Sequence, residues 1–167
     1  KEKNLLYCVD KKYYLSPNYF SRGVCPFNRK EYARIFINTT RELYTKSKSS
    51  QHSNLAYVFQ LIPYMHYDTN VLCRNPREQN TKALEKLSLK DICEMLGLGT
   101  TSKSLTLFKR RLLSFNIEKD GEIYYLFTRV TLETYTGKKD YFVVNPDVIW
   151  KGSSLKLKKE ILLKIRI

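Results

Sequence analysis

Apolar and polar positions follow the period of a helix most regularly between residues 88 and 113. Ser88 stands where an N-cap belongs, and Asp91 three residues later completes a loose capping box. Gly97 and Gly99 then end this helix, because glycine enters left-handed conformations without a Cβ clash. The pattern predicts two short helices joined by a glycine turn, with apolar faces formed by Leu89, Ile92, Cys93 and Leu96 and by Leu105, Phe108 and Leu112.

The second predicted helix leaves a polar and basic face outward. Thr100, Thr101 and Ser102 offer N-caps for it. Two short helices of this kind are typical of a DNA-binding helix-turn-helix, in which the second helix enters the major groove. A helical hairpin with a solvated basic face is the alternative. The outward positions are Ser102, Lys103, Thr106, Lys109 and Arg110.

A long β-hairpin is predicted directly after the helix pair. Residues 123–132 are rich in β-branched and aromatic residues, residues 135–139 form the predicted tip, and residues 140–144 return. A hairpin in this position is a candidate wing that contacts neighbouring phosphates. Arg129 on the strand and Lys138 and Lys139 at the tip suit that role, and a solvated turn is the alternative.

Upstream, the pattern is mostly helical. It predicts one helix over residues 26–44 and a second over residues 54–62, stopped near Pro63. A turn then feeds a short strand that ends at Cys73, which we expect to pair with the wing as a third strand. We therefore predict an α+β fold, a winged helix-turn-helix with additional N-terminal helices and a C-terminal helix. Its parts are an N-terminal helical extension (1–53), a winged-helix domain (54–153) and a C-terminal helix (154–167).

The predicted C-terminal helix carries many apolar residues, which need either the domain's own core or a second subunit. Ser153 and Ser154 are its candidate caps. We expect it to mediate a homodimer, because helix-turn-helix proteins that read palindromes are often two-fold dimers. The apolar residues are Leu155, Leu157, Ile161, Leu162, Ile165 and Ile167.

The charge of the chain favours a nucleic-acid partner over a merely basic soluble protein. Its 30 Lys and Arg residues exceed its 16 Asp and Glu residues, which gives a net charge of +14. Apolar residues are interleaved with the lysines, so the basic surface is expected to be folded. The 13 tyrosines resemble a base-stacking platform, but core or half-buried packing is the better interpretation for those in apolar-periodic segments, Tyr57, Tyr64, Tyr124 and Tyr125.

Enzymatic, metal-binding and membrane-spanning roles find little support in the sequence. His52 and His66 lie 14 residues apart, unlike the paired histidines of a nickase, and are interpreted as exposed bystanders. No phosphate-binding glycine loop is present. The four cysteines, Cys8, Cys25, Cys73 and Cys93, are expected to be reduced core thiols rather than metal ligands. We expect no catalysis, cofactor or metal, no membrane contact, and a cytoplasmic location.

Residues 62–72 combine an aromatic-rich turn with an Asn-Val pair, and residues 141–152 contain Val-Asn-Pro, an aromatic residue and a glycine. These two segments resemble replication and regulatory proteins of Gram-positive plasmids and phages, a winged-helix family. Residues 62–72 (IPYMHYDTNVL) are similar to that family's aromatic turn and its Asn-Val strand start. Residues 141–152 (YFVVNPDVIWKG) are similar to its closing strand. The resemblance covers roughly residues 54–153 and includes no catalytic motif. It implies a winged-helix DNA binder that acts at a plasmid or phage origin, or as a regulator at an operator.

The sequence therefore predicts sequence-specific binding of double-stranded DNA. Base contacts in the major groove are assigned to Ser102, Lys103, Thr106 and Arg110, and phosphate contacts to Thr101, Lys109, Arg129, Lys138 and Lys139. Replication proteins are further expected partners. One alternative is an RNA or single-strand binder, favoured if the tyrosines are exposed on one sheet face. The other is an adaptor, such as a replisome loader, whose basic surface meets an acidic protein.

Overall fold

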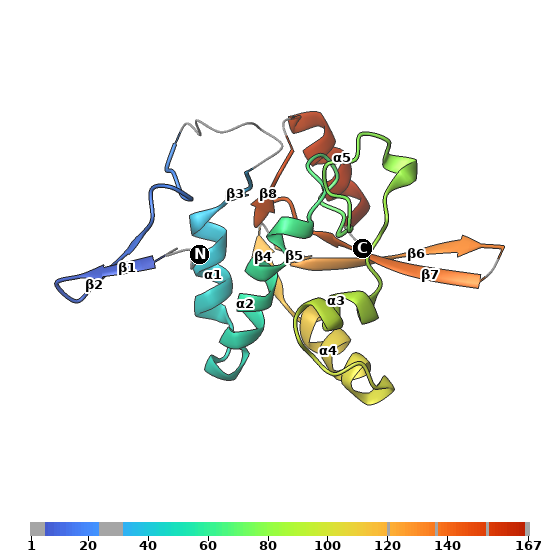
Figure 1. Ribbon diagram of the computed structural model, residues 1–167, viewed down its shortest axis with the longest axis horizontal. Coiled ribbons are helices and arrows are strands. Elements are labelled where there is room, and N and C mark those ends of the chain that lie inside the picture. The colour runs from blue at the N-terminus through green and yellow to red at the C-terminus, as the bar shows by residue number, and fades with distance from the viewer. Residues whose placement is uncertain (1–5, 24–31, 120, 136, 153, 166–167) are drawn as a thin grey trace.

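The chain combines helices with small two-stranded antiparallel sheets, in the mixed α+β class that the sequence predicts (Figure 1). The structure is a computed structural model that describes residues 6–23, 32–119, 121–135, 137–152 and 154–165. The helices are α1 (Ile37–Lys46), α2 (His52–Gln60), α3 (Leu89–Met95), α4 (Ser102–Leu113) and α5 (Leu155–Ile165). The strands are β1 (Leu6–Val9), β2 (Lys12–Leu15), β3 (Arg34–Ile35), β4 (Asn116–Lys119), β5 (Glu122–Tyr125), β6 (Phe127–Thr134), β7 (Gly137–Val144) and β8 (Ile149–Trp150). They pair as β1–β2, β3–β8, β4–β5 and β6–β7, and single 3₁₀ turns form at Ser49–Gln51, Ile62–Tyr64 and Thr81–Ala83.

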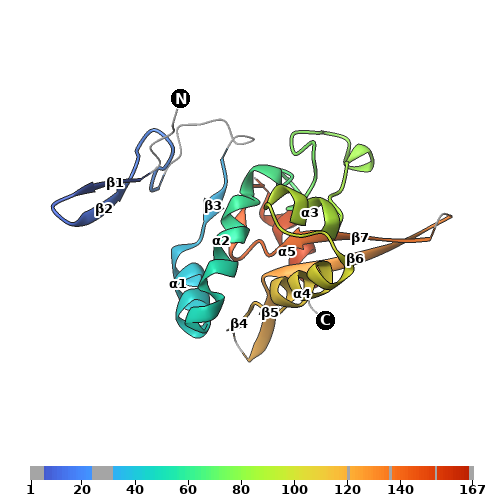
Figure 2. The same ribbon diagram turned by 60° about the horizontal axis from the view of Figure 1, so that its bottom comes forward.

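One hydrophobic core joins α2, α3 and α4 to the hairpin β6–β7. Val58 of α2, Ile92 of α3 and Phe108 of α4 are buried in it. Phe127 of β6 and Phe142 of β7 face the same core. Burying each such side chain contributes about 1.5–3 kcal/mol. The core therefore fixes the position of α4 relative to the hairpin, which lies beside it in Figure 2.

The predicted helix pair is confirmed as α3 and α4. Ser88 caps α3 by accepting the Asp91 N–H, and the Asp91 carboxylate accepts the Ser88 N–H at 2.9 Å. Gly97 has φ +68°, the left-handed conformation expected of the glycine that ends a helix. Thr101 caps α4, and Phe108 and Leu112 form its buried face.

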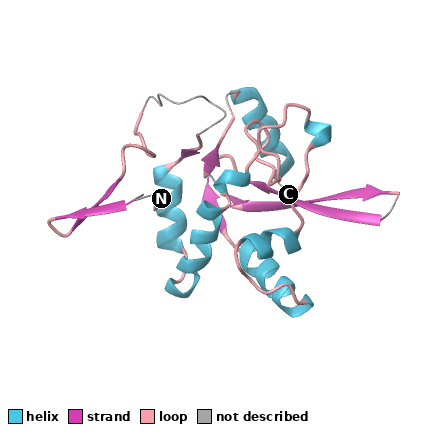
Figure 3. Cartoon of the chain, viewed as in Figure 1, coloured by secondary structure: helices cyan, strands magenta, loops and turns pink. Residues whose placement is uncertain are grey.

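The predicted long hairpin is divided in two. Residues 123–132 do not form a single strand, because β5 ends at Tyr125 and pairs back with β4, while β6 begins at Phe127 and pairs with β7 (Figure 3). The buried Leu126 marks the break: its N–H donates to the Phe115 carbonyl at 2.8 Å, and its carbonyl accepts the Asn145 N–H at 2.9 Å. Because Leu126 bonds to these two distant residues, β5 and β6 do not continue into one strand.

The short strand before the helix pair lies along β7, as expected. Val71 forms an antiparallel bridge with Val143, and the Leu72 N–H donates to the Phe142 carbonyl at 2.9 Å. The Asn70 carbonyl accepts the Val144 N–H at 3.0 Å. Backbone hydrogen bonds therefore join residues 70–72, which precede the helix pair in sequence, to residues 142–144, which follow it.

The N-terminal region differs from its prediction. Within the part of the predicted 26–44 helix that the structure describes, Arg34–Ile35 is strand β3, paired with β8, and helix α1 begins only at Ile37. The Arg34 guanidinium donates to the Gly152 carbonyl at 2.9 Å, and these pairings override the local helical pattern. Residues 26–31 of the predicted helix lie outside the described residues. The hairpin β1–β2 was not predicted, whereas α2 confirms the second predicted helix with its start moved to His52.

Helix α5 confirms the predicted C-terminal helix. The Ser154 hydroxyl accepts the Leu157 N–H at 3.3 Å, whereas Ser153 lies outside the described residues. Lys158 forms an ion pair with Asp147 at 2.9 Å and lies 4.4 Å from the centre of the Phe36 ring. These contacts attach the start of α5 to its own chain, and the homodimer stays a prediction. In the described part of the chain, no helix is both long and apolar enough to span a bilayer.

Candidate nucleic-acid interface

Helix α4 presents one continuous exposed face. Its buried side is set by Phe108 and Leu112. The opposite side carries all four predicted base-reading residues, Ser102, Lys103, Thr106 and Arg110, and each is exposed. Lys103 and Arg110 are separated by two turns, so their Cα atoms lie about 10.5 Å apart along the axis. The exposed face therefore offers two cations flanked by hydroxyl groups, on a scale that fits the major groove.

Two of the hydroxyl groups on this helix already make intrahelical contacts. The Thr101 hydroxyl accepts the Ser104 N–H at 3.3 Å and lies 2.9 Å from the Ser104 hydroxyl, so it serves as the N-cap. The Thr106 hydroxyl donates to the Ser102 carbonyl at 2.9 Å. The Thr106 proton is thereby engaged, and the Thr106 oxygen keeps a lone pair for an incoming donor.

Asp140 on β7 connects the hairpin to α4. Its Oδ2 lies 3.9 Å from the Lys109 Nζ and 3.4 Å from the Arg129 Nη1, and its Oδ1 accepts the Thr131 hydroxyl at 2.7 Å. Two predicted phosphate-binding cations therefore share one carboxylate. Each exposed ion pair is worth about 1 kcal/mol or less. The carboxylate nevertheless lowers the net positive charge on this side of the interface.

Lys138 and Lys139 do not lie in the hairpin tip, as the sequence predicted, but in strand β7. The register pairs Lys138 with Glu133 and Lys139 with Leu132. Successive strand residues point to opposite faces, so only Lys138 shares the face of Asp140. Lys138 also forms an exposed ion pair with Glu133 at 3.3 Å. The two lysines therefore cannot act as one cluster on one face.

Lys103 and Arg110 differ from these cations. Among the residues that the structure describes, neither forms an ion pair within 4.0 Å, whereas Lys109, Arg129 and Lys138 each do. A cation without a carboxylate partner gains more from a phosphate or a guanine edge, because no existing contact has to be broken. Lys103 and Arg110 on α4, together with Lys139 on β7, are thus the cations of the predicted site without an ion-pair partner among the described residues.

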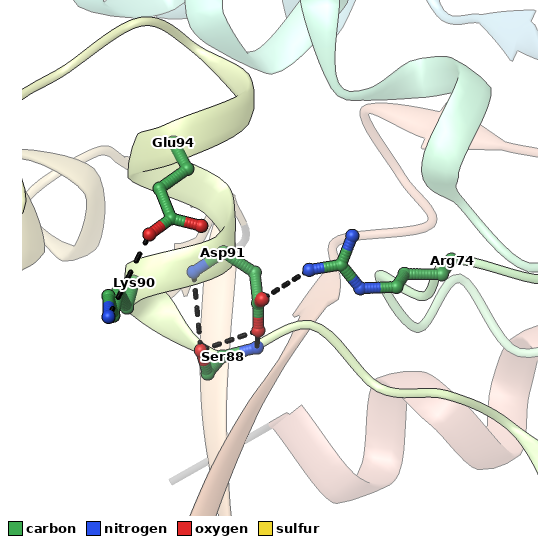
Figure 4. Close-up of polar contacts among 5 residues, drawn as sticks. All are labelled: Arg74, Ser88, Lys90, Asp91 and Glu94. Atoms are coloured by element: carbon green, nitrogen blue, oxygen red, sulfur yellow. Dashed lines mark hydrogen bonds and ion pairs between the residues drawn. The ribbon is translucent and has the colours of Figure 1, made fainter.

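Two further cations near the interface were missed by the sequence interpretation. Arg74 forms an ion pair with Asp91 at the start of α3 (Figure 4). The Ser88 hydroxyl, followed by the Arg74 guanidinium, holds the pKa of the Asp91 carboxyl below its usual range. The Lys86 Nζ lies 4.4 Å from the centre of the Tyr141 ring, in a groove of about 1140 Å³ between residues 84–89 and the hairpin. No local sequence signal marks either contact, since both join distant segments.

The residues that carry the resemblance to plasmid replication proteins have structural roles. Asn70, at φ +54°, is fully buried and donates to the carbonyls of Val144 at 3.1 Å and Ile149 at 2.7 Å. The Asn145 side chain donates to the Tyr125 carbonyl at 3.0 Å. These asparagines therefore join backbone segments that are distant in sequence, which is a structural role.

The histidines are not exposed bystanders. His66 is only 1% exposed; its Nδ1 accepts the Thr69 N–H at 3.2 Å, which leaves the proton on Nε2 to be donated to the Glu78 carbonyl at 2.7 Å. His52 is half-buried and stacks on Tyr44, with ring centres 3.8 Å apart. Both side chains therefore contribute to packing.

The cysteines agree with the prediction only in part. Cys73 and Cys93 are buried thiols, and burial raises the pKa of Cys73 to about 11. Cys8 is exposed, because it lies on the N-terminal hairpin rather than in the core. Cys25 lies outside the described residues. No group of three or more His, Cys, Asp or Glu side chains in the described ranges is arranged to hold a metal ion.

The tyrosines fall into two sets. Tyr57 and Tyr64 pack against the core, as predicted, whereas Tyr125 is 41% exposed, which the prediction had wrong; the side chain of Tyr124 lies outside those described. Tyr7 and Tyr14 on the N-terminal hairpin are also exposed. Comparison with known proteins adds no further guide, since no family model, curated protein or solved structure matches the chain.

Proposed function

We propose that this chain binds double-stranded DNA sequence-specifically, as a winged-helix protein whose α4 enters the major groove. Helices α3 and α4 act as the helix-turn-helix, and the hairpin β6–β7 acts as the wing. The observation that carries the proposal is the exposed face of α4, where Lys103 and Arg110 stand without an ion-pair partner among the described residues. A bidentate arginine on such a face can read guanine.

The wing supplies phosphate contacts from the face that it shares with α4. Lys138 lies on the same face of β7 as Asp140, and Lys109 and Arg129 both form ion pairs with Asp140. Phosphate contacts position the protein on the duplex without reading its sequence. The net charge of +14 supports the same partner, because each cation that neutralises a phosphate releases a counterion.

The biological setting follows from the resemblance of residues 54–153 to plasmid and phage replication proteins. It favours a cytoplasmic initiator at a replication origin, or a regulator at an operator, that acts by binding and not by catalysis. Replication proteins would then be its partners. A homodimer through α5 would place two copies of α4 on the half-sites of a palindrome.

Competition shift assays test the proposal. First, random duplex DNA, single-stranded DNA and RNA compete for the full chain. Preferred duplexes are then selected from a random pool, and the competition is repeated with the selected duplex. We expect selection to yield a defined duplex motif. Lys103→Ala with Arg110→Ala should abolish the preference for that motif. The matched control, Lys48→Ala with Lys82→Ala, removes equal charge from exposed positions outside α4, α5 and the wing and should keep it. Failure of any duplex motif to emerge would refute sequence-specific binding.

A further inference from the structure

The N-terminal hairpin carries a pair of tyrosines that the duplex-binding proposal does not use. Tyr7 of β1 and Tyr14 of β2 are directly opposite in the register. Their rings are stacked, with centres 5.5 Å apart and planes inclined by 18°. Both side chains remain exposed, at 45% and 43%. The pair therefore presents aromatic faces to solvent from one face of a two-stranded ribbon.

The hairpin extends away from the rest of the molecule in both views (Figures 1 and 2). A tight turn joins its strands, with Asp10 at φ +49° and Lys11 at φ +61°. A lone two-stranded hairpin is marginally stable in water, and its exposed aromatic surface is costly unless it has a partner. An extended ribbon with aromatic side chains turned outward is thus a candidate contact surface.

The charge of the hairpin identifies the kind of partner. Lys12 pairs with Val9 and lies on the same face as Tyr7 and Tyr14, two positions along each strand. Residues 6–23 contain three basic residues and one acidic residue, so they share the positive charge of the whole chain. Aromatic faces flanked by cations match single-stranded nucleic acid, whose bases stack while its phosphates pair with lysine.

We propose that the β1–β2 hairpin binds single-stranded nucleic acid by stacking bases on Tyr7 and Tyr14, with Lys12 contacting the backbone. This site is separate from α4 and goes beyond duplex binding. Duplex DNA is a poor ligand for it, since paired bases are already stacked in the helix. A protein whose α4 holds a duplex would thereby hold a melted strand at a second site.

Fluorescence anisotropy with a thymidine oligonucleotide of about 12 nucleotides tests the proposal on the full chain. Tyr7→Ala with Tyr14→Ala should weaken binding by about 5-fold or more for each lost stacking contact. Tyr7→Phe with Tyr14→Phe keeps both ring faces and should bind nearly as well as the native chain. The matched control is Tyr125→Ala, which removes a tyrosine of similar exposure (41%) from another hairpin and should leave affinity unchanged.

Photocrosslinking with a bromouracil-substituted strand gives a readout that does not depend on folding of a variant. We expect the crosslinks on Tyr7 or Tyr14. Equal loss of affinity in the alanine and phenylalanine variants, or crosslinks confined to other residues, would overturn the proposal. It would also be overturned if the alanine variant kept its affinity and lost self-association, because Tyr7 and Tyr14 would then form a contact between copies of the chain.

The two proposals fail separately. Lys103→Ala with Arg110→Ala should weaken duplex binding and leave single-strand binding to the hairpin intact. The opposite result would refute the hairpin site and keep α4 as a nucleic-acid site. In that case the α4 variant loses affinity for the single strand, and the chain with alanine at Tyr7 and Tyr14 keeps it.

Discussion

Replacing Asn70 should destabilise the fold more than any exposed substitution. Its amide donates to two carbonyls, and its φ of +54° lies in the left-handed region. Each lost hydrogen bond costs about 0.5–1.5 kcal/mol, and more when a buried carbonyl is left without a donor. An alanine at this φ adds about 1–2 kcal/mol. We therefore expect Asn70→Ala to lower the free energy of unfolding by about 3–5 kcal/mol.

Asn70→Gly separates the two contributions. Glycine loses the same hydrogen bonds but tolerates the left-handed conformation, so it should cost about 1 kcal/mol less than alanine. Urea unfolding followed by fluorescence measures both variants, because the single tryptophan, Trp150, is 2% exposed and adjoins Ile149. If the two variants are equally stable and both lie within about 1 kcal/mol of the native chain, Asn70 does not hold these segments together.

Three further predictions follow from single contacts. Because Ser88 and Arg74 lower the pKa of Asp91, its contribution to stability is present above the usual carboxyl pKa of about 4 and is lost as pH falls through the folded pKa. In Asp91→Asn, the urea concentration at the unfolding midpoint should therefore depend less on pH between about pH 5 and pH 2 than in the native chain. Gly152→Ala would place a Cβ 2.2 Å from the Trp150 ring and should lower the melting temperature, with a cost of about 1–3 kcal/mol. Asp140→Asn frees two cations and should raise affinity for random duplex; weaker binding in a shift assay would mean that the carboxylate positions them.

The helix pair could be predicted from sequence because its signals are local. A capping box at Ser88, a glycine turn and helical apolar spacing all lie within residues 88–113, and the structure shows each of them. The pairing of Val71 with β7 was also predictable, since a short apolar strand beside a hairpin has few places to pair.

The remaining features depend on contacts between distant segments. Residues 123–132 read as one strand, and nothing near Leu126 signals the break that Phe115 and Asn145 impose. Arg34 and Ile35 lie in a helical pattern, yet they pair with β8 far along the chain. In the site, the pattern identified the exposed residues of α4, but the shared carboxylate of Asp140 and the opposite faces of Lys138 and Lys139 follow only from strand register.

The central claim is that α4 reads bases while the wing holds phosphates, and a titration of duplex affinity over salt and sequence tests it most directly. Arg110→Ala should cost about 1–3 kcal/mol on the selected duplex and much less on random duplex. Lys138→Ala should weaken both duplexes alike and flatten the slope of log affinity against log salt by about 0.9. Equal losses on selected and random duplex for Arg110→Ala would contradict the account, because α4 would then not be the reading helix.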